Sequence, residues 1–247
     1  MATYLLVHGS WHWGGCFMLL TNALASRGHR VLTPDLATHG YDPTPPGSVA
    51  DMAQYTMPAR RLLEAADEKV ILVGHSMGGA TCTYLGEILA ERIACLVYLT
   101  AFMCPNGRCP NDYIVAADYL GDPAAREIVQ ILGPDPLGVR LDLGRPDLVR
   151  TAFYADCTDR TVAVAVRNVI PVTPDAPYRT HSATTSRYAG LRRVYVECTE
   201  DRAIPLAMQR KMQHDVPGAE IVTLTASHSP FFSQPEALAE ILDGLAR

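Results

Sequence analysis

The chain has 247 residues, of which 48% are hydrophobic and 19% charged, with a formal net charge of −5 at pH 7. This length suits one large α/β domain or two small ones with a sizeable apolar core. The sequence has no basic run and no acidic tail, which argues against nucleic acids and membranes as partners. No apolar run is long enough to span a bilayer.

The first residues and the cysteines indicate a cellular compartment. Met1-Ala2-Thr3 leads directly into an apolar stretch, without the basic region of a secretory signal, so we expect a cytoplasmic protein. The seven cysteines are odd in number and lack metal-ligand spacing, which favours reduced thiols. Cys104 and Cys109 lie close together in a loop rich in proline and glycine, so a disulfide between them stays open as the alternative.

Apolar periodicity predicts alternating strands and helices over the first hundred residues. A glycine-rich loop follows the first strand, and a proline-rich loop separates the second strand from a helix capped by Ser48. In chain order we expect a strand at 3–8, a helix at 16–27, a strand at 30–35, a helix at 49–66, a strand at 70–73, a helix at 80–90 and a strand at 93–100.

This alternation stops between residues 101 and 191, where many prolines and glycines divide the chain into short pieces. Helical segments are expected near 112–119, 123–132, 146–155 and 158–168, without strands between them. An insertion of this length is more typical of a helical cap over one edge of a sheet than of a disordered loop.

The alternation returns with a strand at 193–198, a helix at 205–214, a strand at 220–224 and a helix at 235–245. We therefore expect an α/β fold in which a mostly parallel sheet is covered by helices on both faces. Residues 1–100 and 192–247 form its core, and the cap of residues 101–191 is inserted after the fourth strand. In such sheets, functional residues gather at the carboxyl ends of the strands.

The most informative stretch is the predicted strand 70–73 together with Gly74-His75-Ser76-Met77-Gly78. This G-x-S-x-G pattern between a strand and a helix is typical of a nucleophile elbow, which holds its serine in a strained turn above the sheet. Gly74 and Gly78 are needed because a Cβ at either position would crowd the neighbouring strand or helix. The alternative interpretation is a plain turn between strand and helix.

A serine hydroxyl needs a base and an orienting acid to become a nucleophile at neutral pH. Three histidines follow Ser76 in the sequence: His181, His214 and His228. His228 is the predicted base because it lies in a loop after the last strand, whereas His214 ends a helix and His181 falls in the cap. Asp201 is the predicted acid because it follows the strand 193–198. There are two alternatives: Glu200 is the acid instead, or Asp201 is a solvated loop residue without a catalytic role.

The developing oxyanion needs two backbone N–H groups, which we expect from Met77 and from Ser10 in the first glycine-rich loop. Trp11 and His12 then lie near the mouth of the site, although His12 could equally hold the loop in place. Further candidates for substrate contact share an apolar or aromatic character, and each could instead belong to the core of the cap. They are Phe102, Tyr113, Phe153, Tyr154 and Tyr188.

Three segments, 7–12, 74–79 and 194–205, resemble one branch of the α/β-hydrolase superfamily. This branch contains the plant methylesterases of the salicylate-binding type and the hydroxynitrile lyases, and bacterial esterases of the same branch are closer still. The similarity covers both ends of the chain, and the cap is similar chiefly around residues 153–157. The resemblance implies a six-stranded sheet, a triad of Ser76, Asp201 and His228, and no cofactor or metal.

Two positions depart from that branch. The lyases have a threonine where this chain has Gly9, and a lysine where it has Ser229. Because that lysine stabilises cyanide, its absence argues against a lyase. Plant members tend to have methionine at the position of Ser229, so their substrates are not transferred to this chain.

We therefore expect a serine hydrolase that cleaves a small or medium apolar or aromatic ester, such as a methyl ester. One alternative keeps the same triad in a tailoring enzyme of secondary metabolism, a cyclase or a hydrolase of polyketide esters or carbon–carbon bonds. Another is a ligand receptor without catalysis. Haloalkane dehalogenases and epoxide hydrolases are excluded, because they need an aspartate in place of Ser76. A homodimer is conceivable.

Overall fold

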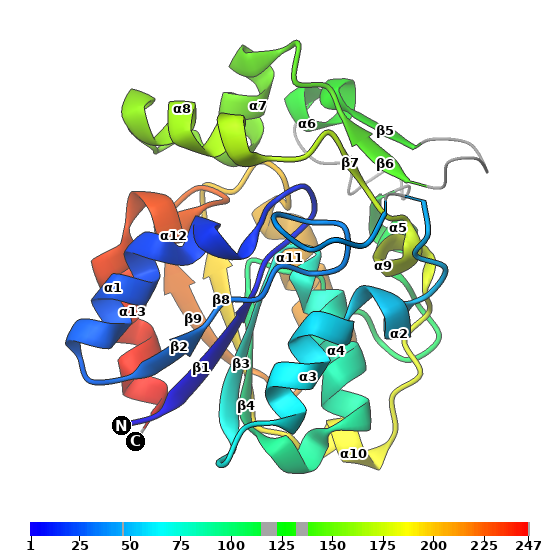
Figure 1. The fold of residues 1–247 in the computed structure, drawn as a ribbon, viewed down its shortest axis with the longest axis vertical. Helices are drawn as coiled ribbons and strands as arrows, with labels where there is room; N and C mark the ends of the chain where they lie inside the picture. The colour runs from blue at the N-terminus through cyan, green and yellow to red at the C-terminus, as the bar shows by residue number, and fades with distance from the viewer. Residues whose placement is uncertain (46, 115–122, 132–137, 247) are drawn as a thin grey trace.

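A six-stranded parallel sheet forms the centre of the computed structural model, which describes residues 1–45, 47–114, 123–131 and 138–246 (Figure 1). Its strands stand in the order β2-β1-β3-β4-β8-β9, and every pairing between them is parallel. The strands are β1 (Thr3–Val7), β2 (Arg30–Leu32), β3 (Val70–His75), β4 (Ile93–Leu99), β8 (Arg193–Cys198) and β9 (Glu220–Leu224). The expected α/β fold and its six-stranded sheet are confirmed.

Helices cover both faces of this sheet, because successive side chains of a buried strand point to opposite sides. In β3, Val70 and Leu72 join the core on one face, and Ile71 and Val73 join the core on the other. The first face is covered by α3 (Met57–Glu64), α4 (Gly78–Ile88) and α11 (Leu206–Asp215), and the second by α1 (Met18–Ser26), α12 (Pro230–Ser233) and α13 (Pro235–Leu245). Shorter pieces are η1 (Gly14–Phe17), α2 (Met52–Tyr55), η2 (Ala90–Arg92) and α10 (Ser186–Ala189).

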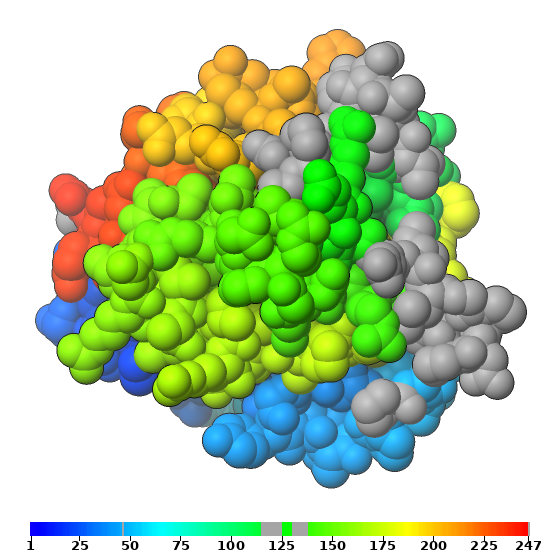
Figure 2. All heavy atoms as spheres, turned by 90° about the horizontal axis from the view of Figure 1, so that it is seen from above, coloured from blue at the N-terminus to red at the C-terminus, as the bar shows by residue number. Residues whose placement is uncertain are grey.

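The segment between β4 and β8 contains strands as well as helices, which corrects the expectation of helices alone. Three short strands pair antiparallel in the order β5-β6-β7. The elements that precede α10 in this segment are α5 (Pro110–Ile114), α6 (Pro123–Ile128), β5 (Val129–Ile131), β6 (Val139–Leu141), α7 (Pro146–Phe153), α8 (Asp159–Asn168), β7 (Val172–Thr173) and α9 (Ala176–Arg179). Most of them lie above the carboxyl ends of the large sheet, and α7 and α8 cover that end of the molecule (Figures 1 and 2).

Two expected helices have different ends in the structure. The helix expected at 123–132 stops at Ile128, because Val129–Ile131 pairs with β6 instead. The helix expected at 49–66 begins at Met52, where Asp51 rather than Ser48 caps it, and it is interrupted at Thr56. Pro58 lacks the N–H that an uninterrupted helix needs at this point.

Two further elements also differ at their ends from the expected ranges. The expected strand 30–35 is paired only as far as Leu32. The expected helix 112–119 begins earlier, at Pro110, and its part beyond Ile114 lies outside the described residues. No helix within the described ranges is both long and apolar enough to cross a membrane.

The order of the strands determines where a site can form. β1 pairs with β2 on one side and with β3 on the other, so the chain reverses its winding direction there. A ligand crevice is expected outside the carboxyl ends of strands at such a switch point. The loop after β1 and the turn after β3 meet at this place, since a Cβ built on Gly9 would lie 2.7 Å from Ser76 Cβ.

Candidate active site

Ser76 lies in a strained turn between β3 and α4. Its φ is +54°, in the left-handed region that residues other than glycine rarely adopt. A Cβ on Gly74 would lie 2.5 Å from the carbonyl oxygen of Gly78, and a Cβ on Gly78 would lie 2.6 Å from that of Val7. The two predictions about this turn, its strain and its need for glycine at both positions, are therefore confirmed.

His228 and Asp201 form a buried hydrogen-bonded pair at the ends of β9 and β8. The distance from His228 Nδ1 to Asp201 Oδ2 is 2.7 Å, and the two side chains are 1% and 0% exposed. Asp201 Oδ1 also accepts hydrogen bonds from the N–H groups of Ala203 and Ile204, both at 2.8 Å. The Thr100 hydroxyl donates to Asp201 Oδ2. With Nδ1 bonded to Asp201, the imidazole keeps Nε2 as its remaining nitrogen.

The rival candidates for acid and base lie elsewhere. Glu200 is exposed, although it is adjacent to Asp201 in sequence. His214 is at the surface with an 86% exposed side chain, beside Asp215. His181 is also exposed and lies near Cys109.

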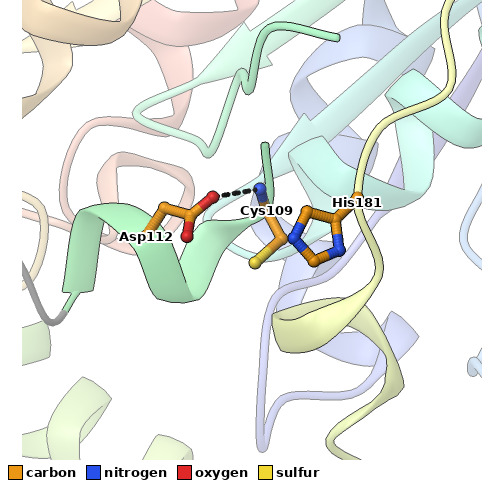
Figure 3. A group of neighbouring side chains, drawn as sticks. All are labelled: Cys109, Asp112 and His181. Carbon is orange, nitrogen blue, oxygen red and sulfur yellow. Dashed lines mark hydrogen bonds between the residues drawn. The ribbon is translucent and has the colours of Figure 1, made fainter. Parts of the chain in front are cut away.

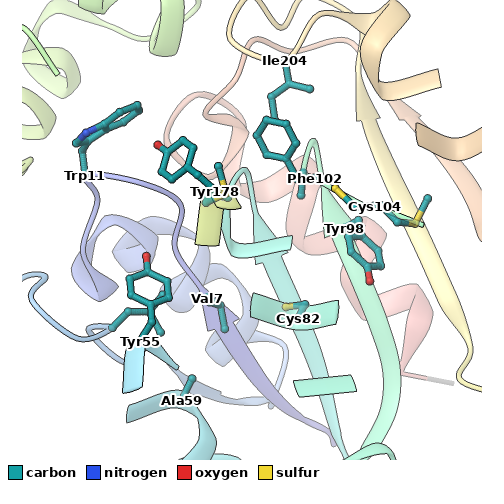
Figure 4. Close-up of a cluster of buried hydrophobic side chains, with 14 of the residues drawn as sticks. Val7, Trp11, Tyr55, Ala59, Cys82, Tyr98, Phe102, Cys104, Tyr178 and Ile204 are labelled. Carbon is teal, nitrogen blue, oxygen red and sulfur yellow. The ribbon is translucent and has the colours of Figure 1, made fainter. Parts of the chain in front are cut away.

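Ser76 opens onto a cavity of about 300 Å³ between the sheet and the elements above it. Ser10 and Met77, the expected oxyanion donors, line the same cavity, and within the described residues neither backbone N–H has a hydrogen-bond partner. Two further lining residues, Phe102 and Ile204, are drawn in Figure 4. The full lining is Ser10, Trp11, Ser76, Met77, Phe102, Ile114, Ala125, Arg126, Val129, Phe153, Tyr178, Ala203, Ile204 and Met208.

Three expected substrate contacts, Trp11, Phe102 and Phe153, thus line the cavity, whereas the other candidates have structural contacts instead. His12 Nδ1 donates to the carbonyl of Ser10 at 2.9 Å, and its Nε2 accepts from the Tyr154 hydroxyl at 2.8 Å. This pair holds the loop after β1, as the alternative interpretation of His12 proposed.

The last two candidates, Tyr113 and Tyr188, are also absent from the lining. The Tyr113 hydroxyl donates to Asp215 Oδ2 at 2.7 Å, and the hydroxyls of Tyr188 and Tyr98 lie 2.8 Å apart. Both side chains are therefore used in packing within the fold.

Sequence patterns do not predict two residues between β4 and β8 that bond to the loops carrying Ser10 and His228. Tyr178 lines the cavity, and its hydroxyl donates to Ser10 Oγ at 2.6 Å. Asp156 accepts from the backbone N–H of Ser227 at 3.0 Å and from the Ser227 hydroxyl. Tyr178 lies in a proline-rich segment without periodicity, while Asp156 falls in the one cap segment, 153–157, that resembles the esterase branch.

The loop after β1 is also bonded to the insertion. Trp11 has a φ of +62°, and its Nε1–H donates to the carbonyl of Val139 in β6 at 2.9 Å. The N–H of Ile170 donates to the carbonyl of Trp11, also at 2.9 Å. One residue that lines the cavity is thus held on both sides by the elements above it.

Two further buried histidines, His75 and His12, lie near His228 and are neutral. His75 Nε2 donates to the carbonyl of His228 at 2.8 Å, and the two rings are 4.6 Å apart. Burial lowers the pKa of His75 well below its ordinary value, and the nearby His228 lowers it further. Burial also lowers the pKa of His12 to about 4. Near Ser76, these groups therefore add no positive charge at neutral pH.

Comparison with known proteins agrees with this architecture. A model of the alpha/beta hydrolase family matches residues 4–241. The pyrethroid hydrolase of Sphingobium wenxiniae is 34% identical over 246 residues, which cover 98% of this chain and 86% of that protein. Methylesterase 7 of Arabidopsis thaliana is 30% identical over 247 residues, which cover 97% of this chain and 94% of that protein.

The crystal structure of a pyrethroid hydrolase from Sphingobium faniae JZ-2 is similar over the whole fold. Its TM-score is 0.92 at 32% sequence identity, and the match covers 99% of this chain and 97% of that one. The resemblance to the methylesterase branch is thereby confirmed, and the chain belongs to the alpha/beta hydrolase family.

Proposed function

We propose that this protein hydrolyses carboxylic esters through a covalent acyl-enzyme, with Ser76 as nucleophile, His228 as base and Asp201 as orienting acid. The observation that carries the proposal is the buried 2.7 Å hydrogen bond between His228 and Asp201. The strained turn at Ser76 and the cavity beside it add to this support. The relatives named as a pyrethroid hydrolase and a methylesterase support an ester as the substrate.

In the proposed reaction, Ser76 Oγ attacks the ester carbonyl carbon while its proton passes to His228 Nε2. The backbone N–H groups of Ser10 and Met77 stabilise the charge on the carbonyl oxygen in the tetrahedral intermediate. His228 then protonates the departing alcohol, which leaves the acyl group on Ser76. A water molecule gives a proton to His228, attacks the acyl carbon and releases the acid, and His228 returns the proton to Ser76.

The cavity favours an apolar or aromatic ester of small or medium size. Its wall contains four aromatic side chains, Trp11, Phe102, Phe153 and Tyr178, beside the aliphatic Ile114 and Ile204. A volume of about 300 Å³ is at the lower end of the range for small-molecule sites. An aryl or branched acyl group esterified with a short alcohol such as methanol fits this size and polarity.

The test of the nucleophile is labelling with a fluorophosphonate probe, followed by peptide mapping of the adduct. We expect one adduct per chain on Ser76, and none in the folded Ser76→Ala variant. Ser229→Ala is the matched control, because Ser229 follows His228 and its buried hydroxyl has no partner within the described residues. Absence of an adduct from folded protein would contradict the proposal and favour a ligand receptor.

Turnover of aryl and methyl esters tests the reaction itself. We expect acid and alcohol in equal amounts, and a loss of kcat of about 10⁴–10⁶-fold in Ser76→Ala or His228→Ala. Labelling of Ser76 without ester turnover, together with a cyclised or carbon-cleaved product from a polyketide-like substrate, would instead favour the tailoring alternative.

A further inference from the structure

Three side chains that the proposed hydrolysis does not use come together beside α5: Cys109, Asp112 and His181 (Figure 3). One sulfur, one carboxylate oxygen and one imidazole nitrogen all lie within 4.8 Å of one another. Cys109 is buried, Asp112 is half-buried and His181 is exposed. We propose that this cluster, named here the Cys109 site, binds a Zn²⁺ ion.

The donor set suits zinc. Zn²⁺ is bound in proteins by thiolate, imidazole and carboxylate groups in tetrahedral geometry. The charges of a Cys109 thiolate and an Asp112 carboxylate balance those of the ion. Tetrahedral bonds of 2.0–2.3 Å place the ligand atoms about 3.3–3.7 Å apart. The three atoms therefore have to approach one another by about 1 Å when the ion binds.

The backbone already holds these residues together, although His181 is distant from the others in sequence. The N–H of Gly107 donates to the carbonyl of Ser182, and the N–H of Ser182 donates to the carbonyl of Arg108, both at 2.8 Å. This pair of hydrogen bonds fixes the segment that carries His181 against the segment that carries Cys109. The two segments that carry the ligands are thus adjacent before any ion binds.

Asp112 is positioned in the same way. Its Oδ2 accepts from the N–H of Cys109 at 3.0 Å and lies 3.3 Å from Arg108 Nε. Neither of these two contacts involves Oδ1, which can therefore turn toward an ion. Figure 3 shows the Cys109 sulfur between the carboxylate and the imidazole.

His181 also borders a second cavity, which neither Cys109 nor Asp112 lines. It measures about 210 Å³, and His181 lines it together with Thr83, Thr180, Ser182 and Thr184. None of the residues lining this cavity lines the one beside Ser76, so the proposed ion is separate from the catalytic groups.

Zinc at the Cys109 site would join the two ends of the insertion. Cys109 and Asp112 lie shortly after β4, and His181 lies shortly before α10. Since Ile114 of the same helix lines the catalytic cavity, the ion would also fix part of that wall. The expected role of the ion is therefore to stabilise the fold where the two ends of the segment between β4 and β8 meet.

The test uses the full chain, freed of metal with a chelator and titrated with Zn²⁺ in a calorimeter. We expect one ion per chain, and a rise in Tm of about 5–10 °C at a free concentration 100 times the Kd. Co²⁺ is the spectroscopic probe, because a thiolate ligand adds a charge-transfer band in the near ultraviolet.

Two ligand variants and two matched controls decide the proposal. Cys109→Ser and His181→Ala should lower the zinc affinity by more than the roughly 10–100-fold that loss of an outer partner costs, and Cys109→Ser should lose the cobalt–thiolate band. Cys104→Ser removes the other thiol of the loop, and His214→Ala removes an exposed histidine beside a carboxylate. Both controls should bind as the parent does.

The proposal would be overturned by zinc binding weaker than about 1 mM, or by an affinity that neither ligand variant changes. It would also be overturned by a Cys104–Cys109 disulfide in protein isolated without reductant, since that bond would remove the thiolate. His181 is exposed, so His181→Ala is expected to fold and to give an interpretable result even where Cys109→Ser does not.

Discussion

Contacts with neighbouring segments keep Ser76 in its strained backbone conformation. A left-handed conformation costs an L-residue roughly 1–2 kcal/mol. The N–H groups of Phe102 and Gly79 both donate to the carbonyl of Ser76 at 3.0 Å and keep it in this conformation. The loop after β1 approaches from the other side, where Gly9 leaves no room for a side chain. The position of the Ser76 hydroxyl therefore depends on residues from three separate segments.

The first prediction concerns Gly9→Ala. The new methyl group would lie 2.7 Å from Ser76 Cβ and 3.1 Å from the carbonyl oxygen of His75, so one of the two segments must move. Because a displacement near 1 Å can cost about 100-fold in rate, we expect kcat/KM for an aryl ester to fall by about that factor. Gly244→Ala is the control, since a Cβ there meets nothing within 4 Å. Equal activities of the two variants would contradict this prediction.

The second prediction concerns Thr100→Val, which keeps the side-chain shape but removes the hydroxyl that donates to Asp201. A hydrogen bond to a charged group contributes about 1.5–3 kcal/mol, so we expect kcat/KM to fall by about 10–100-fold. Thr81→Val is the matched control, because Thr81 is fully buried and its hydroxyl has no partner within the described residues. If both variants lose activity equally, Thr100 acts through packing and not through Asp201.

Sequence reasoning predicts the candidate catalytic residues better than their supports. A local pattern of glycines identifies Ser76. Asp201 and His228 are identified by their positions, since each comes shortly after a predicted strand. The loop after β4, in contrast, carries no recognisable pattern, although its Thr100 bonds to Asp201. Tyr178 had no signal, because its contact with Ser10 arises only once the insertion has folded over the sheet.

At the scale of elements, the insertion is bonded to the loops that carry the candidate catalytic groups. The turn between α7 and α8 reaches the loop before His228 through Asp156 and Ser227. β6 reaches the loop after β1 through Trp11. The geometry around the cavity is therefore set by the insertion and the sheet together.

The third prediction follows from the first of these links. Asp156→Ala removes both hydrogen bonds to Ser227 and frees the loop of His228, so we expect kcat to fall by about 10-fold. KM should change little, since Asp156 does not line the cavity. Asp147→Ala is the control, because that side chain is 70% exposed at the start of α7. Equal kcat values for the two variants, or a change confined to KM, would show that Asp156 does not position His228.

The short strands between β4 and β8 show why sequence patterns fail to predict some elements. β5, β6 and β7 have only two or three residues each, which is too short for an alternation of apolar and polar side chains to be recognised. Val129–Ile131 continues the apolar pattern of α6, so a single helix was expected there. Pairing with β6, a contact distant in sequence, decides in favour of a strand.

At the scale of the whole molecule, several histidines are buried as neutral rings whose two nitrogens have different partners. His8 Nδ1 donates to the carbonyl of Gly9 at 2.8 Å, while its Nε2 accepts from the N–H of Leu36 at 3.0 Å. His39 donates to the carbonyl of Ala37 and accepts from the Thr173 hydroxyl, both at 3.0 Å. A proton added to the accepting nitrogen would break a hydrogen bond and bury a charge.

The last prediction is a loss of stability in mild acid. Burial lowers the pKa of both His12 and His39 to about 4 in the folded protein, against about 6.5 in the unfolded chain. Between these values the unfolded chain binds more protons, so the free energy of unfolding decreases as the pH falls from 6.5 to 4. Each such histidine accounts for about 3 kcal/mol over that range, a large part of the stability of a typical domain.

Urea unfolding at pH 7, 5.5 and 4.5 measures this slope. His39→Asn replaces one titrating ring, so its free energy of unfolding should decrease less steeply over the same range, even if the variant is less stable at pH 7. His214→Asn changes a histidine with an 86% exposed side chain and should keep the parent slope. A stability that stays constant from pH 6.5 to 4.5 would mean that the folded and unfolded chains bind protons equally, so that the buried rings titrate in the fold as they do in the unfolded chain. In that case the hydrogen-bond pattern around His8 and His39 would have to be reassigned.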